Sequence, residues 1–369
     1  MVTHHWQLTT YNPLSVIGLF KQKTPANILF LFVMGILIKL PIFTDPAPPP
    51  EPAQNAAILY REAVNFLISV GKNEGFLFAV ITYFFLFTQA LQLNSLINKN
   101  RMMQRLNFLP ATAYLVITSL MPEWNHFSAP LMVNTLVLVI FSGLFNISHQ
   151  HSIKGSVYNI GVAVGISSFL FFPSIILFFW LVFALLVMRS VRLNEWLICL
   201  LGVTTPYYFY AAYLFFSDKW SWQHLFQPIN IALPAPGQSL WLAIGGILLI
   251  IPFLIGGYFV QENLRKMLIQ VRKNWSLMLI YLLFALFIPF LNNTAEGFEN
   301  WILIIVPFAA FHACTYLYPP QRWIPVTIFW LSILFILIYQ YGGPGWWAIA
   351  DFRLKVSDLL GSFVISGIC

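Results

Sequence analysis

Long apolar runs separated by short polar segments dominate the chain. A helix needs about 20 mostly apolar residues to cross the hydrocarbon of a bilayer, with a lower limit of about 17. The pattern therefore predicts an all-α integral membrane protein of about eleven transmembrane helices. The predicted spans are 27–43, 76–97, 107–121, 129–147, 157–172, 174–188, 197–216, 239–260, 276–291, 301–318 and 324–341.

The fifth and sixth spans share one apolar stretch, residues 157–188, which is too long for a single crossing. Pro173 lies near its middle, in "FLFFPSIIL". A proline removes a helix hydrogen bond and clashes with the preceding turn, so it divides helices. We therefore expect two short helices, 157–172 and 174–188, that meet at the far face of the membrane.

The loop after the first span, residues 44–75, starts as a proline-rich segment, for which we expect an extended path. In the following "NAAILYREAVNFLISVG", apolar side chains recur at spacings of three and four residues. This is the periodicity of an amphipathic helix, and such a helix lies along a membrane surface. Its apolar face is predicted from Leu59, Ala63, Phe66, Leu67 and Val70, and its polar face from Arg61, Asn65, Ser69 and Lys72.

Composition excludes a soluble protein. The chain of 369 residues has only 8% charged residues, against about 25% in soluble domains, and is 59% hydrophobic. The net charge of +7 then reflects membrane topology, so we expect membrane lipids but no nucleic acid as partners. Positive charges collect on cytoplasmic loops. A cytoplasmic N-terminus puts most of the 19 Lys and Arg inside and most of the 12 Asp and Glu outside, which predicts a C-terminus on the outer side.

The same pattern divides the chain into four parts. They are a cytoplasmic or interfacial N-terminus (1–26), a membrane module that includes the first outer loop (27–190), C-terminal transmembrane helices (191–341) and an outer tail (342–369). The N-terminus lacks the charged region and apolar stretch of a cleaved signal peptide, so we expect the first span to be retained. The three cysteines have no spacing typical of a metal site or a disulfide framework.

The first module resembles the membrane glycosyltransferases of the GT-C superfamily over roughly residues 25–190. In that family the first span leads to an outer loop with a carboxylate and then to a juxtamembrane helix, as "LIKLPIFTD" and "NAAILYREAVNFLIS" do here. Short helical hairpins follow, as in "ATAYLVITSLMPEWNHFSAPLMVNTLVLVIFSGLF". The resemblance implies a glycosyltransferase that takes a sugar from a polyprenyl-phosphate carrier at the outer face.

The resemblance assigns roles to two residues at the end of the first span. Asp45 would be the catalytic base that accepts a proton from the acceptor hydroxyl. Lys39 would bind the lipid phosphate, because a cation stabilises the departing anion. The residues alone also fit simpler interpretations. Asp45 could be a solvated loop acid, and the Lys39 side chain could snorkel to the lipid headgroups.

Four further residues complete the implied substrate site. Arg61 or Lys219 could assist with the phosphate, and Glu123 with His126, in "MPEWNHF", could hold the acceptor or a divalent metal. The alternatives are the polar face of the interfacial helix for Arg61, and ordinary loop residues for Glu123 and His126. A metal site needs at least three protein ligands. We therefore expect no cofactor, and the sequence leaves open whether a divalent metal binds.

As a whole the chain also resembles an uncharacterised bacterial inner-membrane family, most closely in "LPATAYLVITSLMPEW" and "RLNEWLICLLGVTTPYYFY". This implies a multi-pass inner-membrane protein with a cytoplasmic N-terminus and a periplasmic C-terminus. Whether the protein is an enzyme stays open. The leading expectation is glycosyl transfer in cell-envelope biogenesis. The alternative is a non-catalytic scaffold or subunit of an envelope assembly or secretion complex, with protein partners.

Overall fold

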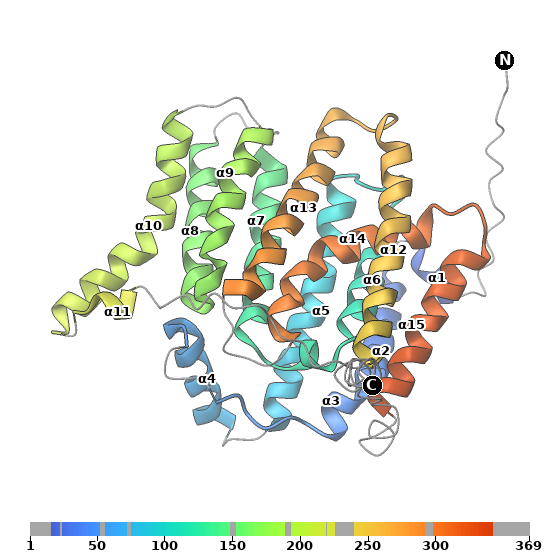
Figure 1. The fold of residues 1–369 in the computed structure, drawn as a ribbon, viewed down its shortest axis with the longest axis horizontal. Helices are drawn as coiled ribbons and strands as arrows, with labels where there is room; N and C mark the ends of the chain where they lie inside the picture. Colours follow the sequence, from blue (N-terminus) through green and yellow to red (C-terminus); the bar gives the residue numbers. More distant parts are fainter. Residues whose placement is uncertain are drawn as a thin grey trace, which may run out of the picture.

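The computed structural model describes residues 16–22, 24–51, 56–71, 75–147, 153–188, 193–218, 220–225, 240–291 and 298–341 (Figure 1). Every regular element in these ranges is helical, which confirms the predicted all-α class. The first half contains α1 (Val16–Phe20), α2 (Ala26–Ile38), α3 (Leu40–Thr44), α4 (Ile58–Gly71), α5 (Gly75–Lys99), α6 (Leu109–Thr118), the 3-10 helix η1 (Pro122–Asn125), α7 (Ala129–Ile147), α8 (Lys154–Leu170), η2 (Phe172–Ile176) and α9 (Leu177–Met188).

The second half contains α10 (Leu193–Phe216), α11 (Trp222–Leu225), α12 (Leu240–Leu264), α13 (Ile269–Phe287), η3 (Ile288–Leu291), η4 (Phe298–Ile304), α14 (Ile305–Leu317) and α15 (Trp323–Tyr341). The outer tail predicted at 342–369 and the first 15 residues of the predicted N-terminal part lie outside the described residues.

Seven helical segments of the described chain are long and apolar enough to cross a membrane, as a multi-pass protein requires. They are α5, α7, α10, α12, α13 with η3, η4 with α14, and α15. A helix occupies each of the eleven predicted segments, but α2, α6, α8 and the η2–α9 segment are shorter. The count of eleven crossings therefore stays a prediction.

The division of the long apolar stretch at Pro173 is confirmed. α8 ends at Leu170, and Phe171 adopts an extended backbone with φ −151° and ψ 103°. Pro173 then lies in the first turn of η2, where its missing amide costs no helix hydrogen bond, and α9 follows.

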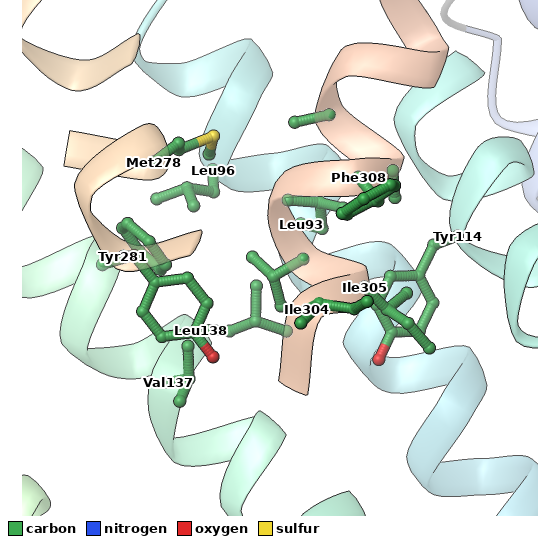
Figure 2. Close-up of a cluster of buried hydrophobic side chains, with 14 of the residues drawn as sticks. Leu93, Leu96, Tyr114, Val137, Leu138, Met278, Tyr281, Ile304, Ile305 and Phe308 are labelled. Atoms are coloured by element: carbon green, nitrogen blue, oxygen red, sulfur yellow. The ribbon is translucent and has the colours of Figure 1, made fainter. Parts of the chain in front are cut away.

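Two short helices, α6 and α14, occupy the centre of the bundle. All ten residues of α6 are buried, and α14 is buried from Ile305 to Tyr316. They pack against each other, α6 against α5 and α14 against α12. Figure 2 shows part of the apolar core that surrounds them. Its labelled side chains come from α5, α6, α7, α13, η4 and α14: Leu93, Leu96, Tyr114, Val137, Leu138, Met278, Tyr281, Ile304, Ile305 and Phe308.

A buried polar network joins this core to the start of α14. The Tyr114 hydroxyl donates to the side-chain oxygen of Gln89 at 2.6 Å and accepts from the Asn134 amide at 2.8 Å. The Tyr281 hydroxyl donates to the carbonyl oxygen of Leu303 at 2.9 Å. Leu303 lies in the 3-10 helix η4, and the Tyr281 side chain supplies a hydrogen-bond partner to its backbone carbonyl. Such bonds fix how the helices dock.

Close contacts through glycine set two helix pairs. A Cβ atom on Gly161 of α8 would lie 2.5 Å from the carbonyl oxygen of Cys199 in α10, and one on Gly202 of α10 would overlap the carbonyl oxygen of Tyr158. A Cβ atom on Gly256 of α12 would likewise overlap α14. Small residues allow helix backbones to approach this closely in membrane proteins. The hydrophobic pattern alone gave no sign of these contacts.

The helix predicted in the first outer loop is present as α4, and the side that it buries is not the predicted apolar face. Tyr60 and Val64 are buried and pack with Phe78 and Phe127. Phe66, on the predicted apolar face, is 66% exposed. The helix therefore has two apolar faces. One covers the bundle, and the other lies at the surface, where membrane lipid would solvate it.

The two ends of the bundle differ in charge. The upper end in Figure 1 holds the C-terminal ends of α5, α9 and α12 and the N-terminal ends of α8, α10 and α13. Basic residues in these turns include Lys99, Lys154, Arg265, Lys266, Arg272 and Lys273. The opposite end carries α3, α4 and η1. We call these the basic end and the α4 end.

Candidate functional site

The most unusual side chain at the α4 end is Lys39. It lies at the break between α2 and α3, where its backbone has φ −103° and ψ 16°, and Pro41 lies in the first turn of α3. Its side chain is fully buried, at 0% exposure. The amine therefore points into the protein and not along its surface, as snorkelling would require.

The Lys39 amine has one hydrogen-bond partner in the described part of the chain. Nζ donates to the side-chain oxygen Oδ1 of Asn125 at 2.5 Å. No ion pair among the described residues involves Lys39. A buried ammonium group without a counter-charge is costly, and it either loses its proton or attracts an anion.

Asn125 belongs to η1, which η4 holds in place. The indole nitrogen of Trp124 donates to the carbonyl oxygen of Phe298 at 2.9 Å. This contact brings together Glu123 and Glu299, both partly buried, and their charges interact. One oxygen of Glu123, Oε2, is buried without a hydrogen-bond partner in the described residues. An acidic pair thus lies beside the residue that binds Lys39.

Glu299 was not found from the sequence. It lies two residues before the predicted span 301–318, and an acid in that position resembles any loop residue. Only the packing of η4 on η1 brings it to Glu123.

Tyr60 and His126 border the acidic pair. The Tyr60 hydroxyl donates to the carbonyl oxygen of Phe127 at 3.4 Å. Burial, followed by the negative charge of Glu299, raises the pKa of Tyr60 above its ordinary value. His126 is exposed and close enough to Glu123 for their charges to interact. The structure therefore brings together three of the predicted site residues, Lys39, Glu123 and His126, around η1.

Asp45 lies apart from this group of side chains. It is exposed at the end of α3, and its amide donates to the carbonyl oxygen of Pro41 at 3.0 Å. Phe43 holds the segment against α5 through ring contacts with Phe76 and Tyr83. Among the described residues, no hydrogen bond or ion pair joins the Asp45 carboxylate to η1. Its position is nevertheless fixed, since the backbone at Ala47 packs directly on α5.

The remaining predicted residues lie elsewhere. Arg61 is on α4, and its Nε atom is 3.8 Å from the carboxylate of the adjacent Glu62, with both side chains well exposed. The positive charge of Arg61 interacts with the Tyr210 side chain of α10. Lys219 lies outside the described residues.

The arrangement offers one buried amine and two interacting carboxylates at one end of the bundle. Within the described ranges, no three His, Cys, Asp or Glu residues are grouped so as to hold a metal ion. A lysine amine can bind an anionic group, and a carboxylate can transfer a proton.

Comparison with known proteins identifies the family. A model described as "Family of unknown function (DUF6427)" matches residues 57–343, most of the chain, so the chain belongs to this family. No curated protein and no solved structure matches it.

Proposed function

We propose that this member of the DUF6427 family is a GT-C-like protein of the bacterial inner membrane that handles a polyprenyl-phosphate-linked sugar or glycan at its α4 end. The observation that carries the proposal is the Lys39 amine, buried and bonded to Asn125 without an acidic partner among the described residues. A phosphate group would supply the missing counter-charge.

The surroundings of Lys39 suit such a substrate. α4, which lies at the same end of the bundle as α3, presents exposed apolar side chains, among them Phe66 and Val70. A lipid-linked substrate needs an apolar surface for its chain and polar groups for its head. In this proposal the α4 end faces the periplasm and the basic end the cytoplasm, as the distribution of positive charge favours.

The roles follow from position. Lys39 binds the phosphate. Asp45, or one of the pair Glu123 and Glu299, takes the proton from the acceptor hydroxyl. The exposed position of Asp45 suits an acceptor that arrives from the aqueous side.

The direct test measures binding of two probes to the purified protein in lipid nanodiscs: a polyprenyl monophosphate and the corresponding polyprenol without phosphate. Wild type should bind the phosphate form at least about tenfold more tightly, which corresponds to about 1.4 kcal/mol. Lys39→Met keeps the length of the stem and should lose this preference. Lys99→Met, an exposed lysine at the basic end, is the matched control and should behave as wild type.

Equal binding of the two probes to wild type, or an unchanged preference in Lys39→Met, would refute the proposal. Catalysis is tested in cells by complementing a deletion strain and measuring polyprenyl-linked lipids by mass spectrometry. Asp45→Asn should leave the protein level normal and abolish transfer. Full activity of this variant would remove Asp45 from the mechanism and leave the acidic pair as the source of the base.

A second candidate function is a non-catalytic scaffold in an envelope assembly or secretion complex. The second half of α10, after Pro206, still contacts α8 through Tyr207 and Tyr210, and its C-terminal end leaves the bundle (Figure 1). This half presents exposed aromatic side chains, including Tyr208, Phe209 and Phe216. A scaffold predicts a stable partner in mild-detergent pull-downs and full complementation by Asp45→Asn and Glu123→Gln, whereas the enzyme predicts loss of transfer.

A further inference from the structure

A groove runs between α9 and α10 on the flank of the bundle. Its volume is about 460 Å³, which lies within the range of roughly 300–1,000 Å³ for small-molecule sites. Its lining is apolar and comes from α9 and the first half of α10: Phe178, Val182, Leu185, Leu193, Trp196, Leu197, Cys199 and Leu200. Leu193 and Leu197 are 78% and 60% exposed, so the groove opens outward.

The groove exists because α9 and α10 have different neighbours. α10 is held close to α8 by the Gly161–Gly202 contact. α9 packs mainly on α13, where the rings of Phe183 and Phe284 meet at 5.7 Å. α8 touches both helices, while α9 and α10 barely touch each other. The space between them is a consequence of backbone packing and not of a missing side chain.

One end of the groove reaches the basic end of the bundle. The amine of Lys273 donates to the carbonyl oxygen of Met188, the last residue of α9, at 3.0 Å. Met188 lies less than one turn beyond the groove residue Leu185. Lys154 starts α8 and Arg272 lies in the first turn of α13, and both side chains are exposed. The groove thus ends beside the positive charge of Lys273, whose neighbour in the chain is Arg272.

We propose that this groove binds an acyl chain of an anionic phospholipid, whose headgroup phosphate is held by Lys273 with Arg272. The apolar lining selects a hydrocarbon chain, and the charges at its end select a negative headgroup at the level of the membrane surface. This site is separate from the proposed substrate site, because it lies at the opposite end of the bundle and uses none of the residues around η1.

The test uses full-length protein in detergent and measures binding of phosphatidylglycerol and phosphatidylcholine by native mass spectrometry. Wild type should bind phosphatidylglycerol at least about tenfold more tightly than phosphatidylcholine. Leu197→Trp fills the groove from its exposed wall and should weaken phosphatidylglycerol binding about tenfold. The matched control is Leu254→Trp on α12, since Leu254 is also 60% exposed but does not line the groove.

The charge component has its own variant. Lys273→Gln should reduce the preference for phosphatidylglycerol over phosphatidylcholine while leaving binding of phosphatidylcholine unchanged. Equal binding of both lipids to wild type, or normal phosphatidylglycerol binding by Leu197→Trp, would overturn the proposal. A change in oligomeric mass on Leu197→Trp would do the same, because it would assign the groove to a second copy of the chain. Leu197→Trp should keep wild-type binding of the polyprenyl monophosphate, which separates this test from that of the proposed function.

Discussion

The amine of Lys39 donates a hydrogen bond of 2.5 Å to the side-chain oxygen of Asn125, although 86 positions separate the two residues. The bond joins the end of α2 to η1, and η1 is in turn bonded to η4 through Trp124. Three segments from distant parts of the chain are thereby held around one buried charge.

Removal of one partner should cost more than removal of both. Asn125→Leu strands the buried amine and should destabilise the protein by about 1–3 kcal/mol, the penalty for a buried polar group that loses its partner. The double variant Lys39→Met/Asn125→Leu leaves no buried charge and should recover most of this loss. Thermal unfolding in detergent measures both melting temperatures. A double variant no more stable than Asn125→Leu would contradict this account.

The contact of α12 with α14 should tolerate no added methyl group at Gly256. A Cβ atom there would overlap the carbonyl oxygen of Phe311. Because backbone cannot move aside cheaply, Gly256→Ala should lower stability by about 1–3 kcal/mol. The adjacent Gly257 is the control, since its Cβ atom would meet nothing within 4 Å.

Gly257→Ala should be neutral or stabilising by up to about 1 kcal/mol, because alanine favours a helix over glycine. The test compares the melting temperatures of purified Gly256→Ala and Gly257→Ala. Equal melting temperatures would show that α12 and α14 do not approach as closely as described.

The network around Tyr114 should be sensitive to loss of a single oxygen atom. Tyr114→Phe removes the acceptor of Asn134 and the donor to Gln89, both of which are buried. We expect a loss of about 1–3 kcal/mol, because the stranded groups keep their desolvation cost. Tyr258→Phe removes a hydroxyl from a side chain that is 66% exposed and should leave the melting temperature unchanged. A Tyr114→Phe variant as stable as Tyr258→Phe would disprove the importance of the network.

The proposed orientation can be tested by labelling single cysteines in spheroplasts. Cys199 and Cys314 are buried and free, and Cys369 would be replaced by serine. Asp45→Cys should react with a membrane-impermeant maleimide in intact spheroplasts. Arg265→Cys, exposed at the basic end, should react only after lysis. The reverse pattern would place the α4 end in the cytoplasm and exclude a periplasmic site there.

The sequence predicted the positions of the helices well, because each depends on local patterns. The break at Pro173 follows from the chemistry of one residue, and a helix was expected where α4 lies. Which face of α4 is buried could not be predicted, because both of its sides carry large apolar residues. The face that turns inward is decided by contacts with Phe78 and Phe127, which are distant in the chain.

The candidate site was predicted less completely for the same reason. Lys39 and Glu123 were singled out by the resemblance of the first module to GT-C enzymes. The partner of Lys39, Asn125, is uncharged and lies in a short loop, so nothing marked it. Glu299 becomes a neighbour of Glu123 only through the packing of η4 on η1. The grouping of such residues depends on tertiary structure, which a single sequence does not display.

The shortness of α6 has a consequence for how the protein is made. Its ten residues extend about 15 Å, half of a bilayer core of about 30 Å, so α6 depends on protein neighbours at its ends. One of its principal neighbours is α14, which leaves the ribosome only after most of the chain has been synthesised. A nascent chain that ends before η4 would therefore be an incompletely packed intermediate. Membrane proteases that degrade unfolded proteins would recognise it as a substrate.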